Sequence, residues 1–418
     1  PGTAEHGGDP VAAAIAAADR LDSSYLAVQG PPGAGKTYLA ARLITHLVAS
    51  GRTVGVCSTS HKAVENVLTA ALHAARTSGA DLPCAKRPPA GKPDPEAPWD
   101  QPKSPKELAA WRAERTTGHL VGGTAWNMAN EAMIADPLDV LVIDEAGQFA
   151  LADTLAVSAA ARDLVLLGDP QQLPQVVQGA HGEGAAASAL EHLVGGAEII
   201  DPELGYFLDQ TRRMHPAVCA PVSQLSYRGL LHAHSSAAER AIGGVPAGLY
   251  RYEVAHSGRA THSPEEVEAV VAIAADLVGR TFHEPGAVVD REITGADVLV
   301  VAPFNLQVRA LRRALDAAGL NGVRVGTVDR FQGQEAPAVI CSMTVSSAAD
   351  AARGLDFVLS RNRLNVALSR AQTVAALVYS PQLGASAPRS VAELRVLAGF
   401  AGLRESAAPW PACGHPCP

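Results

Sequence analysis

A glycine-rich string near the start of the chain has the residue types and the spacing of a phosphate-binding loop. Residues 30–37 read GPPGAGKT, between the β-rich run 25–29 and the helix-forming run 38–43. In a strand–loop–helix unit of this kind, backbone N–H groups and the helix N-terminus surround phosphate oxygens. The string therefore predicts nucleotide binding, with Lys36 at the β- and γ-phosphates and the Thr37 hydroxyl on Mg²⁺. The expected nucleotide contacts of this loop are Gly30, Pro31, Pro32, Gly33, Ala34, Gly35, Lys36, Thr37 and Tyr38.

Two adjacent carboxylates follow the apolar run 140–143, which has the composition of a buried strand. Ligands of open α/β sheets lie at the carboxyl ends of the strands. We therefore predict that Asp144 holds the Mg²⁺ and that Glu145 polarises the water that attacks the γ-phosphate. Another strand end carries Gln172 in the string LLGDPQQLP. An amide there can touch the γ-phosphate, although an ordinary polar turn would have the same composition.

Length and composition indicate a globular protein of two domains. The chain has 418 residues, of which 47% are hydrophobic and only 4% aromatic, so Ala, Val and Leu must fill its cores. This length suits two domains of about 150–200 residues each. The sequence holds no run of 18 apolar residues, and we therefore expect no membrane partner. The six cysteines are scattered, which is typical of a cytosolic protein and not of a disulfide framework.

The net charge of −8 argues against indiscriminate binding to nucleic acid. It still permits a local basic track, because the clustering of charges sets the surface potential. The sequence starts at Pro1 and not at Met, which suggests a piece cut from a longer protein. We see no basic and apolar leader at this start, and we expect a cytoplasmic location.

β-branched runs alternate with Ala-rich helical runs along the chain, which is typical of parallel α/β sheets. Two sets of expected strands indicate two sheets, and only the first set carries a phosphate loop. The first set covers 25–29, 53–58, 120–124, 140–143 and 164–167, and the second covers 298–302, 323–328, 339–343 and 373–379.

These runs also predict the domain boundaries. We expect a first domain in two parts (1–77 and 119–203) around a Pro-rich flexible insertion (78–118), then a second domain (204–400) and a C-terminal tail (401–418). The insertion is rich in Pro, Lys and Asp, a composition that does not support a strand or helix core. In the tail, Cys413 and Cys417 flank a His and could bind zinc. No second ligand pair stands at the usual spacing, so a frayed Pro-rich tail is the other interpretation.

Three further strings follow in order: QTRRMHP at 210–216, TVDRFQGQE at 327–335 and RLNVALSRA at 363–371. Together with the motifs above, they resemble the ordered motifs of superfamily 1 helicases. The resemblance is to the branch of 5′-to-3′ enzymes related to the nonsense-mediated-decay helicase. The strings SYLAVQGPPGAGKTY, SHKAVENVL, GGTAW and SRNRLNVALSRAQ most resemble bacterial proteins that fuse a RecB-like nuclease to this helicase. The resemblance runs from about residue 20 to about residue 385.

The resemblance implies two tandem RecA-like P-loop domains of α/β fold, each with a parallel sheet, and an ATP cleft between them. It implies that ATP and Mg²⁺ are the cofactors. Arg213 and Arg370 would be arginine fingers, which place fixed guanidinium charge on the transferred phosphoryl group. The alternative for each is a surface salt bridge worth less than about 1 kcal/mol. The residues implied in catalysis or nucleotide binding are Lys36, Thr37, Asp144, Glu145 and Gln172 in the first domain and Arg213, Gly333, Glu335 and Arg370 in the second.

The resemblance also implies a track for single-stranded nucleic acid across both domains. Hydroxyls, amides and loop N–H groups bind phosphates without reading the base sequence. Trp126 and Phe304 could stack on bases for about 1–3 kcal/mol each, or could be core residues. The candidates on the track are Ser60, His61, Lys62, Thr124, Trp126, Pro303, Phe304, Asn305, Thr327, Arg330 and Gln332.

Three features depart from the family pattern. Arg212 stands where relatives often have an aromatic residue, no glutamine motif precedes Gln29, and the insertion at 78–118 is short where relatives often carry a β-barrel. Strand separation is therefore less firmly predicted than ATPase activity. Our leading hypothesis is a 5′-to-3′ translocase on single-stranded DNA, with a nuclease domain upstream of Pro1 if the fusion holds. The alternatives are an RNA helicase and an ATP-driven switch that grips nucleic acid without unwinding it.

Overall fold

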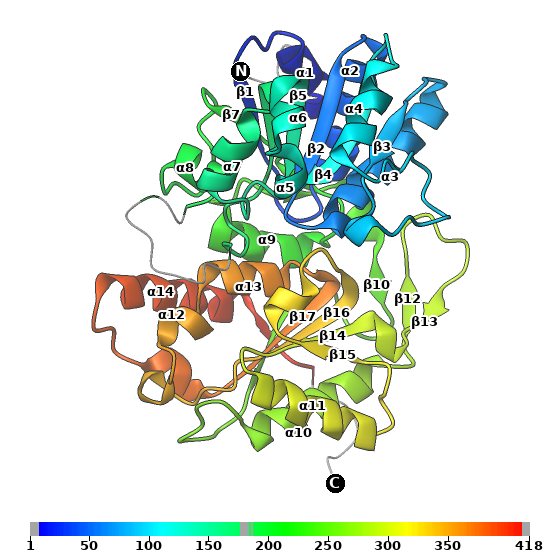
Figure 1. Cartoon of the computed structure of the whole chain (residues 1–418). Helices are drawn as coiled ribbons and strands as arrows, with labels where there is room; N and C mark the ends of the chain where they lie inside the picture. The colour runs from blue at the N-terminus through cyan, green and yellow to red at the C-terminus, as the bar shows by residue number, and fades with distance from the viewer. Residues whose placement is uncertain (1–7, 176–183, 185–186, 412–418) are drawn as a thin grey trace. The chain divides into compact units, whose positions relative to one another are not determined.

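The computed structural model describes residues 8–175, 184 and 187–411. The chain divides into two compact α/β units, each built around its own parallel sheet (Figure 1). The first unit comprises the chain up to Pro31 with Gly35–Pro170 and Pro174–Leu208; the second comprises Pro32–Ala34, Gln171–Leu173 and the chain from Asp209. The expected fold class, two tandem α/β domains with parallel sheets, is confirmed.

The first unit contains a seven-stranded parallel sheet in the order β3-β4-β2-β5-β6-β1-β7. Every expected strand of the first set is present to within three residues at either end. The strands are β1 (Tyr25–Gln29), β2 (Thr53–Ser58), β3 (Cys84–Lys86), β4 (His119–Thr124), β5 (Leu138–Asp144), β6 (Ala161–Gly168) and β7 (Gly205–Phe207). The helices are α1 (Pro10–Ala18), α2 (Lys36–Ala49), α3 (His61–Ser78), α4 (Pro105–Ala113), α5 (Ala125–Met128), α6 (Glu131–Ala135), α7 (Leu151–Ser158) and α8 (Ala189–Val194).

The segment 78–118 is more ordered than its composition predicts. Its first part forms β3, whose three residues are buried and pair in parallel with β4. After a short 3₁₀ turn (Pro89–Gly91), α4 begins at Pro105 with Ser104 as its N-cap. The expectation that this segment lacks a strand or helix core is therefore wrong. The reason is non-local, because β4 supplies the hydrogen-bond partners of β3 from outside the Pro-rich run.

The second unit contains a six-stranded parallel sheet in the order β15-β14-β16-β17-β11-β18. Its strands are β11 (Gly248–Glu253), β14 (Val298–Val301), β15 (Arg324–Gly326), β16 (Ala336–Ser342), β17 (Ala371–Tyr379) and β18 (Ala408–Pro409). Two smaller sheets join β8 (Gln210–Thr211) to β9 (His232–Ala233), and β10 (Ala241–Ile242) to β12 (Thr281–His283) and β13 (Arg291–Glu292). Short 3₁₀ helices include η3 (Ser235–Glu239) and η5 (Val328–Phe331).

Helices cover both faces of the second sheet. In Figure 1, α10 and α11 lie together against one face, and α9 and α13 lie against the other. The helices are α9 (Pro216–Ser226), α10 (Pro264–Leu277), α11 (Asn305–Ala317), α12 (Leu355–Val358), α13 (Arg361–Leu368) and α14 (Val391–Ser406). The Ser263 hydroxyl accepts a hydrogen bond from Glu266 N (3.2 Å), which confirms the predicted start of α10.

The last described residues belong to the second unit and are not a separate tail. α14 continues to Ser406, and β18 then pairs in parallel with β11. Trp410 packs edge-on against Tyr250, with 5.2 Å between the ring centroids. The proposed zinc ligands Cys413 and Cys417 lie outside the described residues. No helix in the described part of the chain is long and apolar enough to cross a membrane.

Candidate nucleotide and nucleic-acid sites

The phosphate loop connects β1 to α2 in the first unit. Gly35 has a left-handed backbone (φ 88°) and caps α2, which starts at Lys36. The Lys36 Nζ donates a hydrogen bond to Gly30 O (2.5 Å), so its ammonium is held across the loop. A Cβ on Gly30 would overlap the Lys36 side chain, with Cδ only 2.8 Å away. The sequence therefore needs glycine at position 30 for the lysine to take this path.

The loop and Asp144 lie at the same edge of the sheet because β6 stands between β1 and β5. Gly30 N donates to Gly168 O and Ala146 N donates to Leu167 O, both at 2.8 Å. The loops after β1 and β5 are thus both bonded to the end of β6. A Cβ on Gly168 would lie 2.5 Å from Gly147 N, so this close approach also depends on glycine.

The Asp144 carboxyl carries the strongest electrostatic perturbation of this edge. Burial and, after it, the negative charge of Glu145 raise its pKa to about 7, against the opposing positive charge of Lys36. A buried carboxylate beside a second carboxylate is an environment that favours a cation. The exposed Thr37 hydroxyl in the first turn of α2 supplies a second oxygen. This donor set fits Mg²⁺, which takes one or two protein oxygens and completes its shell with phosphate and water.

Glu145 is held in a less common backbone conformation. Its φ of 57° is left-handed, which L-residues other than glycine adopt at a cost of about 1–3 kcal/mol. Gln148 Nε2 donates to Glu145 Oε2 (3.2 Å) and fixes the carboxylate from outside the strand. Strain of this kind clusters at functional sites, which supports the expected role of Glu145. Sequence reasoning missed Gln148, because nothing in its spacing distinguishes it from an ordinary surface glutamine.

The loop after β6 carries the expected γ-phosphate contact. Gln172 lies four residues beyond the end of β6 and is buried. Asp169, in the same loop, is buried and accepts from Gln29 Nε2 (3.4 Å). The Gln29 side chain also accepts from Ile200 N (2.7 Å), so it ties the end of β1 to the chain that leads into β7. The structure therefore gives Gln29 a positioning role that sequence reasoning did not find.

In the second unit, the predicted Arg213 and Glu335 form an ion pair. Arg213 Nε donates to Glu335 Oε2 (2.6 Å), and its Nη1 donates to Ser369 O (3.2 Å). Gln372 Nε2 donates to the other carboxylate oxygen of Glu335 (2.9 Å). Burial raises the pKa of Glu335, but the charge and hydrogen bond of Arg213 outweigh burial and leave the pKa lowered. Two strings that are 122 residues apart thus meet in one charged cluster.

Arg370 lies beside this cluster and is almost fully buried. The pairing of β16 with β17 places Ala336 opposite Ala371, so Glu335 and Arg370 precede neighbouring strands. The Arg370 guanidinium donates to Val366 O (2.9 Å), Gln334 O (3.2 Å) and Ser369 Oγ (3.4 Å). The surface-salt-bridge alternative therefore does not describe Arg370. Gly333, in the turn just before, has a left-handed backbone (φ 77°) that favours glycine.

Comparisons with known proteins find helicases on both parts of the chain. Two sequence families, each described as an AAA domain, match residues 12–193 and 186–381. The DNA replication ATP-dependent helicase/nuclease DNA2 of Xenopus laevis is 26% identical over 384 residues, which cover 84% of this chain and 35% of that protein. The DNA-binding protein SMUBP-2 of Rattus norvegicus is 30% identical over 266 residues, which cover 58% of this chain and 25% of that protein.

The two matched families cover the segments that hold the nucleotide loop, Asp144 and the Arg213–Glu335 pair. The matched families and these relatives support the resemblance of the chain to the 5′-to-3′ branch of the superfamily 1 helicases. The chain spans 35% and 25% of the lengths of the two relatives named above. Among solved structures, the chain is similar to the arterivirus nonstructural protein 10 (helicase) in complex with DNA. The match covers 89% of this chain and 62% of the viral chain, with 16% identity and a TM-score of 0.44.

The nucleic-acid candidates of the first unit lie at the ends of two neighbouring strands, β2 and β4. Ser60 caps α3 directly after β2, and the exposed Lys62 stands in the first turn. Thr124 ends β4 and caps α5, and Ser58 of β2 is its register partner. Trp126 on α5 is 90% exposed, so core packing does not account for it. His61 is half-buried, and burial followed by the charge of Lys86 lowers its pKa.

In the second unit, the aromatic candidate is buried, whereas two of the polar candidates are exposed. Phe304 is only 9% exposed and its ring lies 5.6 Å from that of Phe357, so the expected base stacking is not available to it here. Pro303 and the exposed Asn305 flank it after β14. Thr327 follows β15, the neighbour of β14, and Arg330 is exposed on η5. The half-buried Gln332 lies just beyond η5.

Proposed function

We propose that the chain is the motor part of a helicase, an ATPase that moves 5′ to 3′ along single-stranded DNA. The observation that carries this proposal lies in the first unit. The nucleotide candidates follow β1, β5 and β6, and the single-strand candidates follow β2 and β4. Because β2 and β5 are paired neighbours, the two sets share one edge of a single sheet. A change at the nucleotide can therefore reach the strand-binding loops across one pair of strands.

In this proposal, residues of the first unit and of the loops bonded to it would bind the nucleotide and activate water. Backbone N–H groups of the loop and the N-terminus of α2 would bind the phosphates, and Lys36 would exchange its bond to Gly30 O for phosphate oxygens. Thr37 and Asp144 would hold Mg²⁺, which neutralises charge on the phosphate oxygens when bound. Glu145, fixed by Gln148, would orient the attacking water. Gln172 would report the γ-phosphate from the loop after β6.

The second unit would supply fixed positive charge to the transferred phosphoryl group. Arg213 and Arg370 are the expected sources, and the Arg213–Glu335 ion pair supports a role for the first of them. A preference for DNA over RNA is favoured by the relatives, one named as a DNA replication helicase/nuclease and the other as a DNA-binding protein. The upstream nuclease domain and the cytoplasmic location stay predictions.

Steady-state ATPase assays test the proposal directly. The rate is measured without nucleic acid, with single-stranded DNA and with single-stranded RNA, and Lys36→Ala serves as the blank. Stimulation by DNA alone supports the DNA motor. Equal stimulation by RNA would favour the RNA helicase. A rate that ignores both polymers would contradict a motor that moves along nucleic acid.

One observation favours the second candidate, an ATP-driven switch that grips nucleic acid without unwinding it. All of the segment 78–118 is described, and it holds only β3, one 3₁₀ turn and α4. It contains none of the β-barrel that family members often carry at this place. A strand-displacement assay on a 5′-tailed duplex separates the two candidates. A switch would hydrolyse ATP in the presence of DNA and leave the duplex intact, whereas the motor would release the strand.

A further inference from the structure

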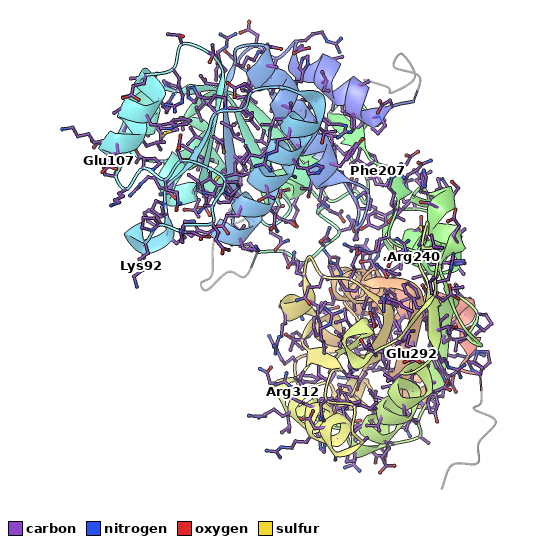
Figure 2. All side chains as sticks on the ribbon, turned by 90° about the vertical axis from the view of Figure 1, so that its right-hand side faces the viewer. Lys92, Glu107, Phe207, Arg240, Glu292 and Arg312 are labelled. Carbon is purple, nitrogen blue, oxygen red and sulfur yellow. The ribbon has the colours of Figure 1, made fainter. Side chains whose placement is uncertain are left out.

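The connection between β8 and α9 is held by an arginine that lies far from it in sequence. The two elements are joined by residues 212–215, which include the expected arginine finger Arg213. Arg240 stands between η3 and β10, and its Nη1 donates to Arg212 O (2.8 Å) and to Arg213 O (2.9 Å). One nitrogen thus fixes two consecutive carbonyl groups. Arg240, which directly precedes β10, is labelled in Figure 2.

The ends of this connection are anchored by backbone bonds. His234 N donates to Thr211 O (2.8 Å) at the β8 end, and His215 N donates to Gln372 O (2.7 Å) at the α9 end. Arg240 acts between these anchors, at the carbonyls of Arg212 and Arg213. Arg240 thus holds the backbone at the point from which the Arg213 side chain leaves it, between the two anchors.

The positive charge of Arg240 also affects the pKa values of two neighbouring groups, Glu335 and His215. It contributes to the lowered pKa of Glu335, after burial and the stronger effects of Arg213 and Gln372. It also lowers the pKa of His215, after the effect of burial. Arg240 therefore lies close enough to the Arg213–Glu335 pair to influence its electrostatics as well as its backbone.

The geometry favours arginine over lysine at this position. Within the described residues, the buried Nε of Arg240 has no hydrogen-bond acceptor, and an unpaired buried N–H is unfavourable. A guanidinium is planar and rigid, whereas a lysine ammonium is a point charge on a flexible stem. A lysine would keep the charge but would not hold both carbonyls in a fixed geometry.

We propose that Arg240 is a positioning residue that fixes the Arg212–Arg213 backbone and so aims Arg213 for ATP hydrolysis. This inference rests on the proposed function, because it requires that Arg213 acts on ATP. Arg240 acts through Arg213 and need not touch the nucleotide.

A double-mutant cycle tests this coupling. Arg240→Ala in the wild-type background should lower kcat about 10- to 100-fold, because misplacing a catalytic group by about 1 Å can cost about 10²-fold. KM for ATP should change little. In the Arg213→Ala background, the same substitution should have no further effect on kcat, because residues that act as a unit are not additive. Arg240→Lys should recover only part of the rate.

Arg280→Ala is the matched control. The Arg280 guanidinium also donates to a backbone carbonyl, Gly243 O (2.9 Å), and pairs with Asp276 (2.5 Å), but it contacts no residue of 212–215 among the described contacts. The kcat of the Arg280→Ala variant should stay at the wild-type level even if its Tm falls. If Arg240→Ala does not fold, the cycle is measured with Arg240→Lys.

Four outcomes would contradict the inference. An additive effect of Arg240→Ala in the Arg213→Ala background would overturn it, and so would a kcat equal to that of Arg280→Ala. Wild-type protein that does not exceed the Lys36→Ala blank would overturn the proposed function, and this inference with it. An active wild type with an unaffected Arg240 variant would overturn only the role of Arg240.

Discussion

The two units place their functional residues on their sheets in different ways. In the first unit, the nucleotide and single-strand candidates lie side by side at the carboxyl edge, divided between the β5–β6–β1 half and the β4–β2 half. In the second unit, Asn305 and Thr327 follow the carboxyl ends of β14 and β15. Glu335 and Arg370 instead precede the amino ends of β16 and β17, at the opposite edge.

This difference indicates two routes by which a nucleotide could affect a bound strand. In the first unit the route is lateral, from β5 to its neighbour β2. In the second unit the route follows one stretch of chain, residues 327–335, which leaves β15 at one edge and enters β16 at the other. Arg324 supports this stretch, since its guanidinium donates to Gln334 Oε1 (3.1 Å) and Glu335 O (3.2 Å).

The largest effect is expected from the arginines of the second unit. Arg213→Ala should lower kcat for ATP about 10³-fold or more, the range measured for fixed guanidinium charge in phosphoryl transfer. Nucleotide affinity should persist, because the first unit provides the phosphate loop. Arg370→Ala should have the same effect on kcat and also lower Tm, since two buried acceptors and one part-buried acceptor lose their donor. ATPase kinetics, nucleotide titration and thermal denaturation measure the three quantities. An unchanged kcat in both variants would show that these two arginines of the second unit take no part in ATP hydrolysis.

The next effect tests the nucleotide half of the first unit. Glu145→Gln keeps the size of the side chain but removes its charge, and kcat should fall about 10²–10³-fold, as when one preorganised catalytic group is lost. Gln148→Ala should lower kcat less, because it only releases the Glu145 carboxylate from one bond. Single-turnover hydrolysis with bound ATP checks both. Full activity in Glu145→Gln would contradict the assigned role.

A smaller effect separates the single-strand halves of the two units. Trp126→Ala should weaken binding of single-stranded DNA by about 1–3 kcal/mol and leave Tm unchanged, because the ring is exposed. Phe304→Ala should leave the affinity for single-stranded DNA unchanged. It should lower the free energy of unfolding by about 3–5 kcal/mol, as for a buried aromatic. Fluorescence anisotropy and thermal denaturation distinguish them. Equal losses of DNA affinity would show that both units stack bases.

The smallest effect is a pH dependence at Asp144. Its folded pKa is raised from 3.8 to about 7, so this group favours the folded state fully below pH 3.8 and progressively less as pH rises through about 7. Mg²⁺ needs the ionised carboxylate, so its affinity in the presence of nucleotide should fall about tenfold per pH unit below 7. Stability of the free protein and Mg²⁺ affinity should therefore change in opposite directions with pH. Asp144→Asn should abolish both trends, and parallel trends would refute the assignment.

The sequence predicts well what is contiguous along the chain. The phosphate loop is preceded by β1 and followed by α2 at the expected residues, because strand, turn and helix signals lie within one short window. The expected strands of both sheets are present, since each is a buried run of β-branched residues. The motif resemblance further indicated that Arg213 and Glu335 belong to one site, which their ion pair in the second unit is consistent with.

The sequence does not predict what depends on distant partners. β3 and β11 were missed because their pairing partners β4 and β17 lie elsewhere in the chain. Phe304 was equally compatible with stacking and with the core until Phe357 was placed against it. Arg240 lies in a segment without a clear pattern, and its two carbonyl acceptors carry no sequence signal at all.

The close contact between the loops after β5 and β6 limits which side chains the chain can carry at these positions. Gly147 and Gly168 approach so closely that one added methyl group at either would overlap the backbone of the other loop. Neither residue is expected to touch nucleotide or DNA. Yet a systematic substitution scan should rank them among the least replaceable positions, since any side chain there would move Asp144 away from Lys36. Tolerance to mutation in this fold is thus set by backbone spacing as much as by chemistry.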